Sequence, residues 1–415
     1  MNQEAHNPTG SALRSRVERT RTSAVSVLLL ALLVSACLHR SAEPDLGNLS
    51  PYPPTATEGE IIDLAPFLDD VIERSNVPAL GAIVVSEDSV IASGFSGLRR
   101  RGSEQAVDLD DIVHIGSLGK SMTSVLAAML VREGRLYWNS SPPDILPEIE
   151  PSAAWRRSSL ERLLRMNAGV DRNAEIDAVF DRWLNARDRS ERGQSQRAEL
   201  ARAALSTAPA YTPGSSLHYS NFSYALAGHM LEVSAGQSFE QLMQERLFAQ
   251  LGLTRAGFGA PAGDAAVWGH SPDGEPVPPG PEADNPAMLS PAGRVHLTIP
   301  EYGSYMQFIL RGANGRSDLL SRADFARLFE PFNDGAERYA MGWEVRDDAG
   351  PNVTTLAHTG SNSAWYAYAW MVPERGIGIF AVTNQGGAEL LLDAVIWRLV
   401  LAELERRSHQ TSTSH

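Results

Sequence analysis

The only lysine of the chain follows a serine by three residues, in the segment Ser117-Leu118-Gly119-Lys120. Apolar residues then recur at helical spacing as far as Gly134, which predicts a helix that begins near Ser117. Residues three apart on a helix lie on one side, so we expect the Lys120 amine within reach of the Ser117 hydroxyl. This pair is the first candidate for chemistry.

The composition of the basic residues supports a chemical role for this lysine. Of the 36 basic residues, every one except Lys120 is arginine. Arginine stays protonated near neutral pH, whereas a buried lysine can lose its proton. A chain that otherwise relies on arginine for positive charge therefore indicates that position 120 needs an amine that can become neutral. A general base beside a serine nucleophile has that requirement.

Simpler interpretations of this segment stay open. Serine is common in the chain, so a Ser-x-x-Lys spacing can arise by chance. Ser117 could serve only as a helix N-cap. Gly119-Lys120-Ser121 also matches the end of a phosphate-binding loop, but His114 stands where that loop requires glycine.

Two later segments supply the other groups that an acylating serine needs. Tyr219 and Asn221 flank Ser220 where a loop meets an apolar-periodic helix, and His358-Thr359-Gly360-Ser361 follows a short predicted strand. A tyrosine can carry a proton, an amide can orient a carbonyl, and a glycine lets the backbone approach a ligand closely. Each segment alone is weak, because Tyr-x-Asn is common and a single histidine is more often structural.

The three segments, in this order, resemble the motifs of the serine β-lactamase and penicillin-recognising family. The resemblance covers about residues 60 to 405, with further matches at Pro291-Ala292-Gly293 and Met341-Gly342-Trp343. The branch that looks most similar contains class C β-lactamases, D-alanyl-D-alanine carboxypeptidases with His-Thr-Gly, and related esterases.

The resemblance implies a role for each matching position. Ser117 would be the nucleophile, Lys120 its base, Tyr219 a proton carrier in the form of a partly ionised phenol, and Asn221 a substrate-orienting amide. The backbone N–H groups of Ser117 and Ser361 would form the oxyanion hole, with Thr359 and Gly360 beside the substrate. His358 stands where β-lactamases carry a lysine. Because a neutral imidazole anchors a carboxylate less well than an ammonium, we expect weak handling of β-lactams and favour esters or D-amino-acid peptides.

Hydrophobic patterning and the resemblance predict an α/β (α+β) fold, β-lactamase/transpeptidase-like, over residues 59–408. An antiparallel sheet would be completed from both ends of the chain and flanked by N- and C-terminal helices, with a mostly helical subdomain at about 140–310 inserted. The predicted strands span 80–85, 89–95, 339–345, 354–357, 365–372 and 377–383, and the two flanking helices 61–75 and 390–405. Residues 409–415 are expected to be a disordered tail.

The N-terminus has the pattern of a bacterial lipoprotein leader. Four arginines precede an apolar run from Ala24 to Val34, and Val34-Ser35-Ala36-Cys37 resembles a lipobox. We therefore expect a signal peptide at 1–36, a lipid anchor on Cys37 and a flexible tether at 37–58. Leu38, which is not Asp, favours the outer membrane of the cell envelope. An ordinary secretory signal is the alternative.

The remaining composition narrows the function. The net charge of −14 and the lack of a basic run argue against nucleic-acid binding. We expect no cofactor and no metal, because there is no His-Glu-x-x-His and Cys37 is the single cysteine. No Gly-x-Ser-x-Gly elbow is present either. The prediction is an exported serine hydrolase that forms an acyl-enzyme with a small-molecule or peptidoglycan-derived ester, amide or lactam. The alternative is a non-catalytic cell-envelope binding protein with the same fold.

Overall fold

The structure is a computed structural model, which describes residues 46–47, 49–52, 59–150, 152–171, 174–185, 193–263, 266–280, 283–349 and 353–413. The predicted signal peptide and Cys37 lie outside the described residues.

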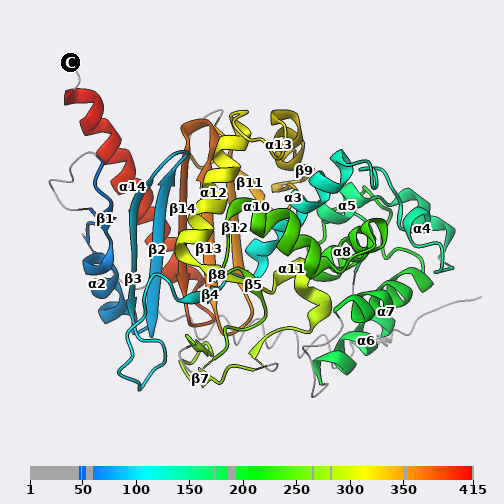
Figure 1. The fold of residues 1–415 in the computed structure, drawn as a ribbon, viewed down its shortest axis with the longest axis horizontal. Coiled ribbons are helices and arrows are strands. Elements are labelled where there is room, and N and C mark those ends of the chain that lie inside the picture. The colour runs from blue at the N-terminus through cyan, green and yellow to red at the C-terminus, as the bar shows by residue number, and fades with distance from the viewer. Residues whose placement is uncertain are drawn as a thin grey trace, which may run out of the picture. The chain divides into compact units, whose positions relative to one another are not determined.

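A nine-stranded sheet is the frame of the domain, with strand order β1-β3-β2-β14-β13-β12-β11-β10-β9 (Figure 1). Neighbouring strands are antiparallel except for β1 and β3, which are parallel. The strands are β1 (Ile62–Asp63), β2 (Ala79–Ser86), β3 (Val90–Gly97), β9 (Phe332–Asp334), β10 (Glu337–Tyr339), β11 (Glu344–Arg346), β12 (Thr355–Ser361), β13 (Tyr366–Val372) and β14 (Ile377–Thr383). The sheet is completed from both ends of the chain, as predicted, because β2 pairs with β14 from Leu80 opposite Thr383 to Ser86 opposite Ile377.

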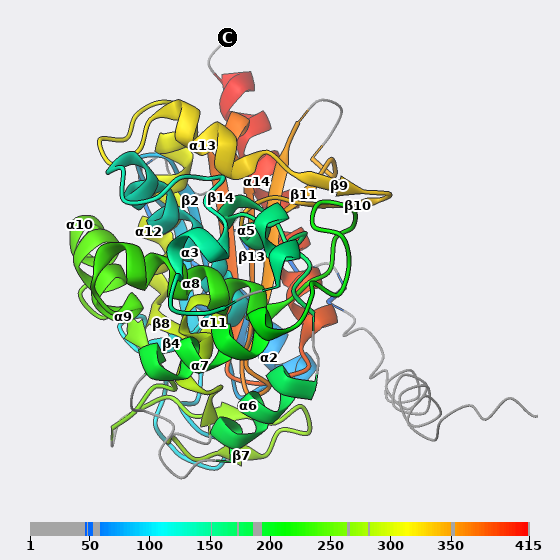
Figure 2. The same ribbon diagram turned by 90° about the vertical axis from the view of Figure 1, so that its right-hand side faces the viewer.

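Helices cover both faces of this sheet (Figures 1 and 2). On one face α2 (Ala65–Ser75) and α14 (Glu389–Thr413) bury apolar side chains such as Leu68 and Ile396 against the strands. On the other face α12 (Ile299–Ala313) packs Tyr302 and Met306 into a core with Ile83 of β2. Burial of these apolar side chains is the main source of stability for the sheet.

The inserted subdomain is mostly helical, as predicted, and packs around α3 (Gly119–Arg132). Its helices are α4 (Pro142–Ile145), α5 (Leu160–Leu164), α6 (Ala174–Leu184), α7 (Gly193–Ser206), α8 (Asn221–Ala235), α9 (Phe239–Leu242), α10 (Ala249–Leu251) and α11 (Ser290–Gly293). A three-stranded sheet of β4 (Ile112–His114), β8 (Val295–Thr298) and β5 (Gly257–Phe258) lies beside it. The structure also contains helix α13 (Arg322–Phe329) and a hairpin of β6 (Gly269–His270) and β7 (Pro276–Val277).

Several predicted boundaries differ from the structure. The first helix begins at Ala65, because Ile62 and Asp63 pair with β3. The strand predicted over 339–345 is two strands, since Gly342 adopts a φ of 88° and turns the chain between β10 and β11. The C-terminal helix continues to Thr413, through most of the predicted tail.

One part of the predicted tether packs against the domain. Leu46 is 4% exposed and contributes to the core beside α14. The Arg398 guanidinium of α14 donates a hydrogen bond to the carbonyl of Gly47. Residues 46–47 are therefore held against the domain, in contrast to the expectation of a flexible tether, while 37–45, 48 and 53–58 lie outside the described residues.

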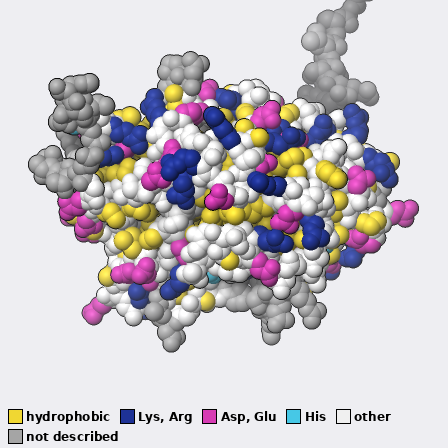
Figure 3. Space-filling model, turned by 45° about the horizontal axis from the view of Figure 1, so that its top comes forward, with side chains coloured by type: hydrophobic (Ala, Val, Ile, Leu, Met, Phe, Trp, Pro, Cys, Tyr) yellow, Lys and Arg dark blue, Asp and Glu magenta, His cyan; other side chains and the backbone are white. Residues whose placement is uncertain are grey.

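The surface mixes charges of both signs. In Figure 3, arginine and acidic side chains are interspersed over the face shown. Among the described helices, none is both long and apolar enough to span a bilayer. The described residues also contain no cluster of three histidine, cysteine or acidic side chains that could hold a metal ion.

Candidate active site

Ser117 lies in a short 3₁₀ turn, Gly116–Leu118, which joins β4 to α3. The turn starts from Gly116 at a φ of 52°, a conformation that favours glycine. Leu118 occupies the N-cap position of α3, and no side chain caps this end. The cap interpretation of Ser117 is therefore wrong, and its hydroxyl is available for other partners.

Lys120 lies one turn later with its amine completely buried beneath Ser117. Its Nζ lies 2.9 Å from Ser117 Oγ, 2.7 Å from Asn221 Oδ1 and 2.6 Å from the carbonyl oxygen of Ala292. The amide and carbonyl oxygens can only accept hydrogen bonds. A neutral amine would donate its two protons to them, which leaves its lone pair for the Ser117 hydroxyl.

The surroundings of Lys120 favour this neutral form. Burial holds the pKa of the Lys120 amine well below its ordinary value of 10.5. No carboxylate among the described residues forms an ion pair with it. Desolvation without a compensating anion disfavours the charged form of an amine. The buried amine is therefore of the kind that the residue composition indicated, and its role as a base stays a prediction.

Tyr219 and Asn221 reach the same place from the start of α8. Ser220 caps this helix, because its side chain accepts the N–H of Ser223, and Asn221 is the first helical residue. The Tyr219 ring centre is 4.9 Å from Lys120 Nζ, and the Ser117 side chain lies near enough to its hydroxyl to influence the pKa of the phenol. Although half of Tyr219 is exposed, burial around its hydroxyl raises the pKa of the phenol. The expectation of a partly ionised phenol is therefore corrected: the resting phenol is protonated.

The nucleophile turn presses directly against the backbone of β12. A Cβ atom on Gly116 would lie 2.3 Å from the nitrogen of Ser361, and one on Gly360 would lie 2.9 Å from the nitrogen of Ser117. Both distances are too short for a real side-chain atom, so only glycine allows this approach. The two backbone N–H groups predicted to bind the oxyanion are thus neighbours.

His358 differs from its predicted role as a substrate contact. Its ring is buried, with Nε2 3.1 Å from the Tyr339 hydroxyl and Nδ1 2.5 Å from the carbonyl oxygen of Thr359. The carbonyl must accept from Nδ1–H, so Nε2 accepts from Tyr339. Burial is the main cause that lowers the pKa of His358, to about 4. The imidazole is neutral and both its nitrogens are engaged.

The sequence interpretation did not identify two groups of this site. The carbonyl of Ala292 accepts from Lys120, and the Tyr339 hydroxyl fixes the His358 ring. Both lie in or beside segments that the family resemblance had matched, Pro291-Ala292-Gly293 and Met341-Gly342-Trp343. The signal was present, but a backbone carbonyl and a buried strand tyrosine have no motif of their own.

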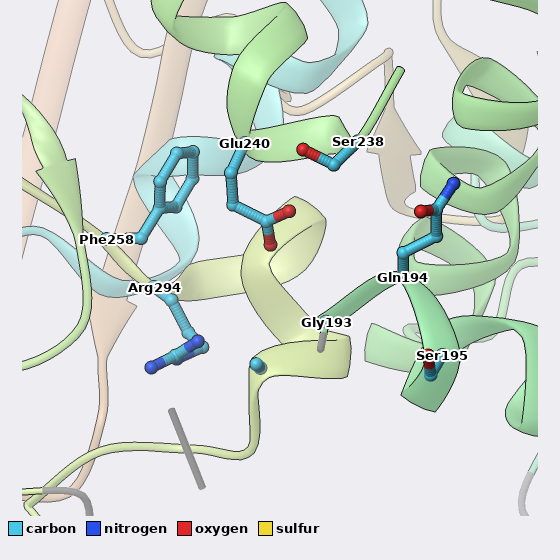
Figure 4. A pocket seen from close by; sticks show the side chains of 8 residues that line it. Gly193, Gln194, Ser195, Ser238, Glu240, Phe258 and Arg294 are labelled. Atoms are coloured by element: carbon cyan, nitrogen blue, oxygen red, sulfur yellow. The ribbon is translucent and has the colours of Figure 1, made fainter. Parts of the chain in front are cut away.

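A separate polar cavity of about 430 Å³ lies in the helical subdomain and includes none of the predicted site residues. Figure 4 shows that Glu240 and Arg294 reach this cavity from different segments of the chain. Glu240 pairs with Arg197, and Arg294 pairs with Asp284. Since these charged groups already have partners, the cavity lacks the features of a second reaction centre.

Comparison with known proteins agrees with this geometry. The sequence profile of the family described as "Beta-lactamase" matches residues 64–402. The chain is 25% identical to penicillin-binding protein 4 of Amycolatopsis lactamdurans, over 81% of this chain and 88% of the relative. It is 22% identical to the D-alanyl-D-alanine-carboxypeptidase/endopeptidase AmpH of Escherichia coli, over 86% and 91%. The octameric penicillin-binding protein homologue from Pyrococcus abyssi shares the fold, with a TM-score of 0.66 and 18% identity, over 80% of this chain and 76% of that one.

Proposed function

Because this chain belongs to the β-lactamase family of serine hydrolases, we propose that it is an exported hydrolase that forms an acyl-enzyme on Ser117. The observation that carries the proposal is the contact of 2.9 Å between Ser117 Oγ and the Lys120 amine, which has two acceptor-only oxygens as its other partners. A serine hydroxyl placed against an amine that can be neutral is an activated nucleophile.

The proposed reaction proceeds in two half-steps. Ser117 Oγ attacks the carbonyl carbon while its proton passes to Lys120, and the carbonyl oxygen gains negative charge beside the N–H groups of Ser117 and Ser361. When the tetrahedral intermediate collapses, the bond to the leaving group breaks. The protonated phenol of Tyr219 gives its proton to that group and regains one from Lys120. Water then attacks the acyl-enzyme along the reverse proton route.

The state of His358 bears on the substrate. A lysine ammonium at that position would offer a permanent charge to a substrate carboxylate, whereas the neutral His358 ring has both nitrogens engaged. Uncharged esters are therefore the substrates that suit this site best. D-amino-acid peptides are the second candidate, supported by the name of the E. coli relative, a D-alanyl-D-alanine carboxypeptidase.

Intact-mass analysis tests the proposal. The protein is incubated separately with p-nitrophenyl butyrate, a D-Ala-D-Ala peptide and nitrocefin. The mass of the intact protein is then measured to detect a trapped acyl-enzyme. We expect a butyryl adduct on the wild type and none on the Ser117→Ala variant, with the weakest labelling by nitrocefin. Absence of any adduct and of any turnover would favour the non-catalytic binding protein instead.

Export and lipid anchoring are proposed from the N-terminal sequence. Several acyl chains on one cysteine hold a protein firmly on a membrane, whereas one chain binds marginally. We expect the Cys37→Ser variant to leave the membrane fraction, with Ser35→Thr as the control that keeps the cysteine. If Cys37→Ser fractionates like the wild type, the lipid-anchor proposal is wrong.

A further inference from the structure

A buried histidine and carboxylate lie directly under the nucleophile turn. His114 Nε2 is 3.2 Å from Asp284 Oδ2, and both side chains are almost fully excluded from solvent. The N–H of Gly116 points at His114 Nδ1 over 3.2 Å. Because an N–H can only donate, Nδ1 accepts and the ring proton stays on Nε2, facing Asp284. The carboxylate thus fixes the tautomer that holds the residue before Ser117.

The same carboxylate reaches the other side of the predicted oxyanion hole. Its Oδ1 lies 3.4 Å from the Asn362 amide nitrogen, and that nitrogen also donates to the carbonyl of Ala283 at 3.2 Å. Asn362 directly follows Ser361. Asp284 and its neighbour therefore tether the end of β12 as well as the nucleophile turn.

A third contact of Asp284 links it to the segment that binds the Lys120 amine. Arg294 Nε donates to Asp284 Oδ2 over 3.3 Å. Arg294 lies two residues after Ala292, whose carbonyl accepts from the Lys120 amine. Burial alone would raise the pKa of Asp284, but the hydrogen bond from His114, the charge of Arg294 and the N–H of Asn285 outweigh it and lower this pKa, so the carboxylate remains charged in the interior. One buried anion is thus joined to the three backbone segments that meet at Ser117.

The positions of these backbone segments matter because stabilisation of an oxyanion depends on the distance and direction of its N–H donors. Donors act when they lie about 2.7–3.1 Å from the developing charge, and losing one typically costs about 10²–10³ in rate. The N–H groups of Ser117 and Ser361 belong to separate segments, the turn Gly116–Leu118 and the end of β12. Something must fix their relative position.

We propose that Asp284 is the positioning residue of this site, which holds the nucleophile turn through His114, the end of β12 through Asn362 and the Ala292 segment through Arg294. The proposal rests on the acyl-enzyme function proposed above. It predicts that Asp284 contributes to the transition state and very little to substrate binding.

The Asp284→Asn variant tests this role with almost no change in volume. The amide nitrogen would donate to His114 Nε2 and drive the ring proton to Nδ1, against the Gly116 N–H. We expect kcat for p-nitrophenyl butyrate to fall about 10- to 100-fold, less than complete loss of a donor, because the hole is displaced and not removed. KM should stay within about twofold, since ground-state contacts are unchanged.

The chain offers a matched control in a second buried trio of a histidine, a carboxylate and an arginine, with glutamate in place of aspartate. Glu232 pairs with His229 at 3.1 Å and with Arg197, and it is as buried as Asp284. No contact joins that trio to Ser117, Lys120 or Ser361 among the described residues. Glu232→Gln should lower the melting temperature and leave kcat of the folded enzyme unchanged.

A tetrahedral inhibitor distinguishes a loss of oxyanion-hole geometry from a general destabilisation of the protein. Phenylboronic acid adds to the serine and places an oxygen in the oxyanion hole, whereas butyrate binds as a ground-state product. We expect the inhibition constant of the boronic acid to rise about tenfold in Asp284→Asn and that of butyrate to stay the same. If Asp284→Asn does not fold, the less buried Asn362→Ala should show the same pattern at a few-fold smaller effect.

A fluorophosphonate probe distinguishes the failure of this proposal from the failure of the function. In this reaction Ser117 Oγ forms a bond to phosphorus, fluoride leaves and the serine proton goes to Lys120. If the wild type reacts and Asp284→Asn reacts equally fast, with unchanged boronic-acid affinity, the positioning role is refuted. A wild type that reacts with neither ester nor probe overturns the proposed function, and this proposal with it.

Discussion

Replacing Lys120 by arginine keeps a positive charge on a long stem and removes only the ability to become neutral. The arginine side chain has five N–H donors and no acceptor, so it can satisfy Asn221 Oδ1 and the Ala292 carbonyl. It cannot accept the Ser117 proton. The variant therefore separates electrostatic attraction, which arginine preserves, from proton acceptance, which it abolishes.

The structure sets the expected magnitude. A lysine with the ordinary pKa of 10.5 would be neutral in only about 0.3% of molecules at pH 8, but burial lowers this pKa and raises the neutral fraction. Loss of a general base typically costs about 10²–10⁴ in rate. We expect kcat/KM of Lys120→Arg to fall by at least about 10², and wild-type activity to rise with pH and level off far below pH 10.5.

The assay is initial-rate hydrolysis of p-nitrophenyl butyrate from pH 5 to 9, with the folded fraction of each variant measured by thermal unfolding. Lys120→Ala serves as the companion that removes charge and base together. Both variants should be equally poor catalysts. If Lys120→Arg keeps more than about a tenth of the wild-type kcat/KM, or if the wild-type rate still climbs steeply at the upper end of this pH range, the argument for a neutral amine is refuted.

Three other perturbations follow from the contacts around this pair. His358 has a pKa of about 4 when folded and 6.5 when free. Between these values the unfolded chain binds a proton that the folded protein does not, so the free energy of unfolding falls as the pH is lowered. In urea unfolding, the free energy of unfolding should be about 2 kcal/mol lower at pH 5 than at neutral pH, and this difference should vanish in His358→Gln. Tyr339→Phe removes the donor to the buried His358 ring and should cost about 1–3 kcal/mol in the same assay, and an unchanged unfolding midpoint would contradict the bond. Gly360→Ala would place a Cβ atom 2.1 Å from the carbonyl oxygen of Ile115 and should reduce kcat by at least about 10², while Gly280→Ala, in open space, should behave as wild type.

The parts of the fold that local sequence determines were predictable. The hairpin at 80–95 and the strands near 366–383 follow β-branched runs punctuated by turn residues, and they appear as β2, β3, β13 and β14. The predicted start of the first helix was wrong for a reason that lies elsewhere in the chain. Ile62 and Asp63 pair with Ala92 and Ser93 of β3, which the helical pattern could not reveal.

The site was predictable to the level of its motifs. Ser117, Lys120, Tyr219 and Asn221 meet as expected, because short-range spacing and family resemblance identify each segment. The protonation of the Tyr219 phenol and the engagement of His358 were not predictable. Both depend on burial and on partners distant in sequence, such as Tyr339, and no periodicity in the chain encodes them.

The join between β2 and β14 has a consequence for biosynthesis. Thr383 bonds to the carbonyl of Ala79, 304 positions earlier in the chain, and long-range pairing of this kind slows folding. The central sheet therefore cannot close until β14 (Ile377–Thr383) has left the ribosome. If the N–H groups of Ser117 and Ser361 form the oxyanion hole proposed above, we expect a nascent chain in which β12 (Thr355–Ser361) has not yet reached the serine to be chemically silent.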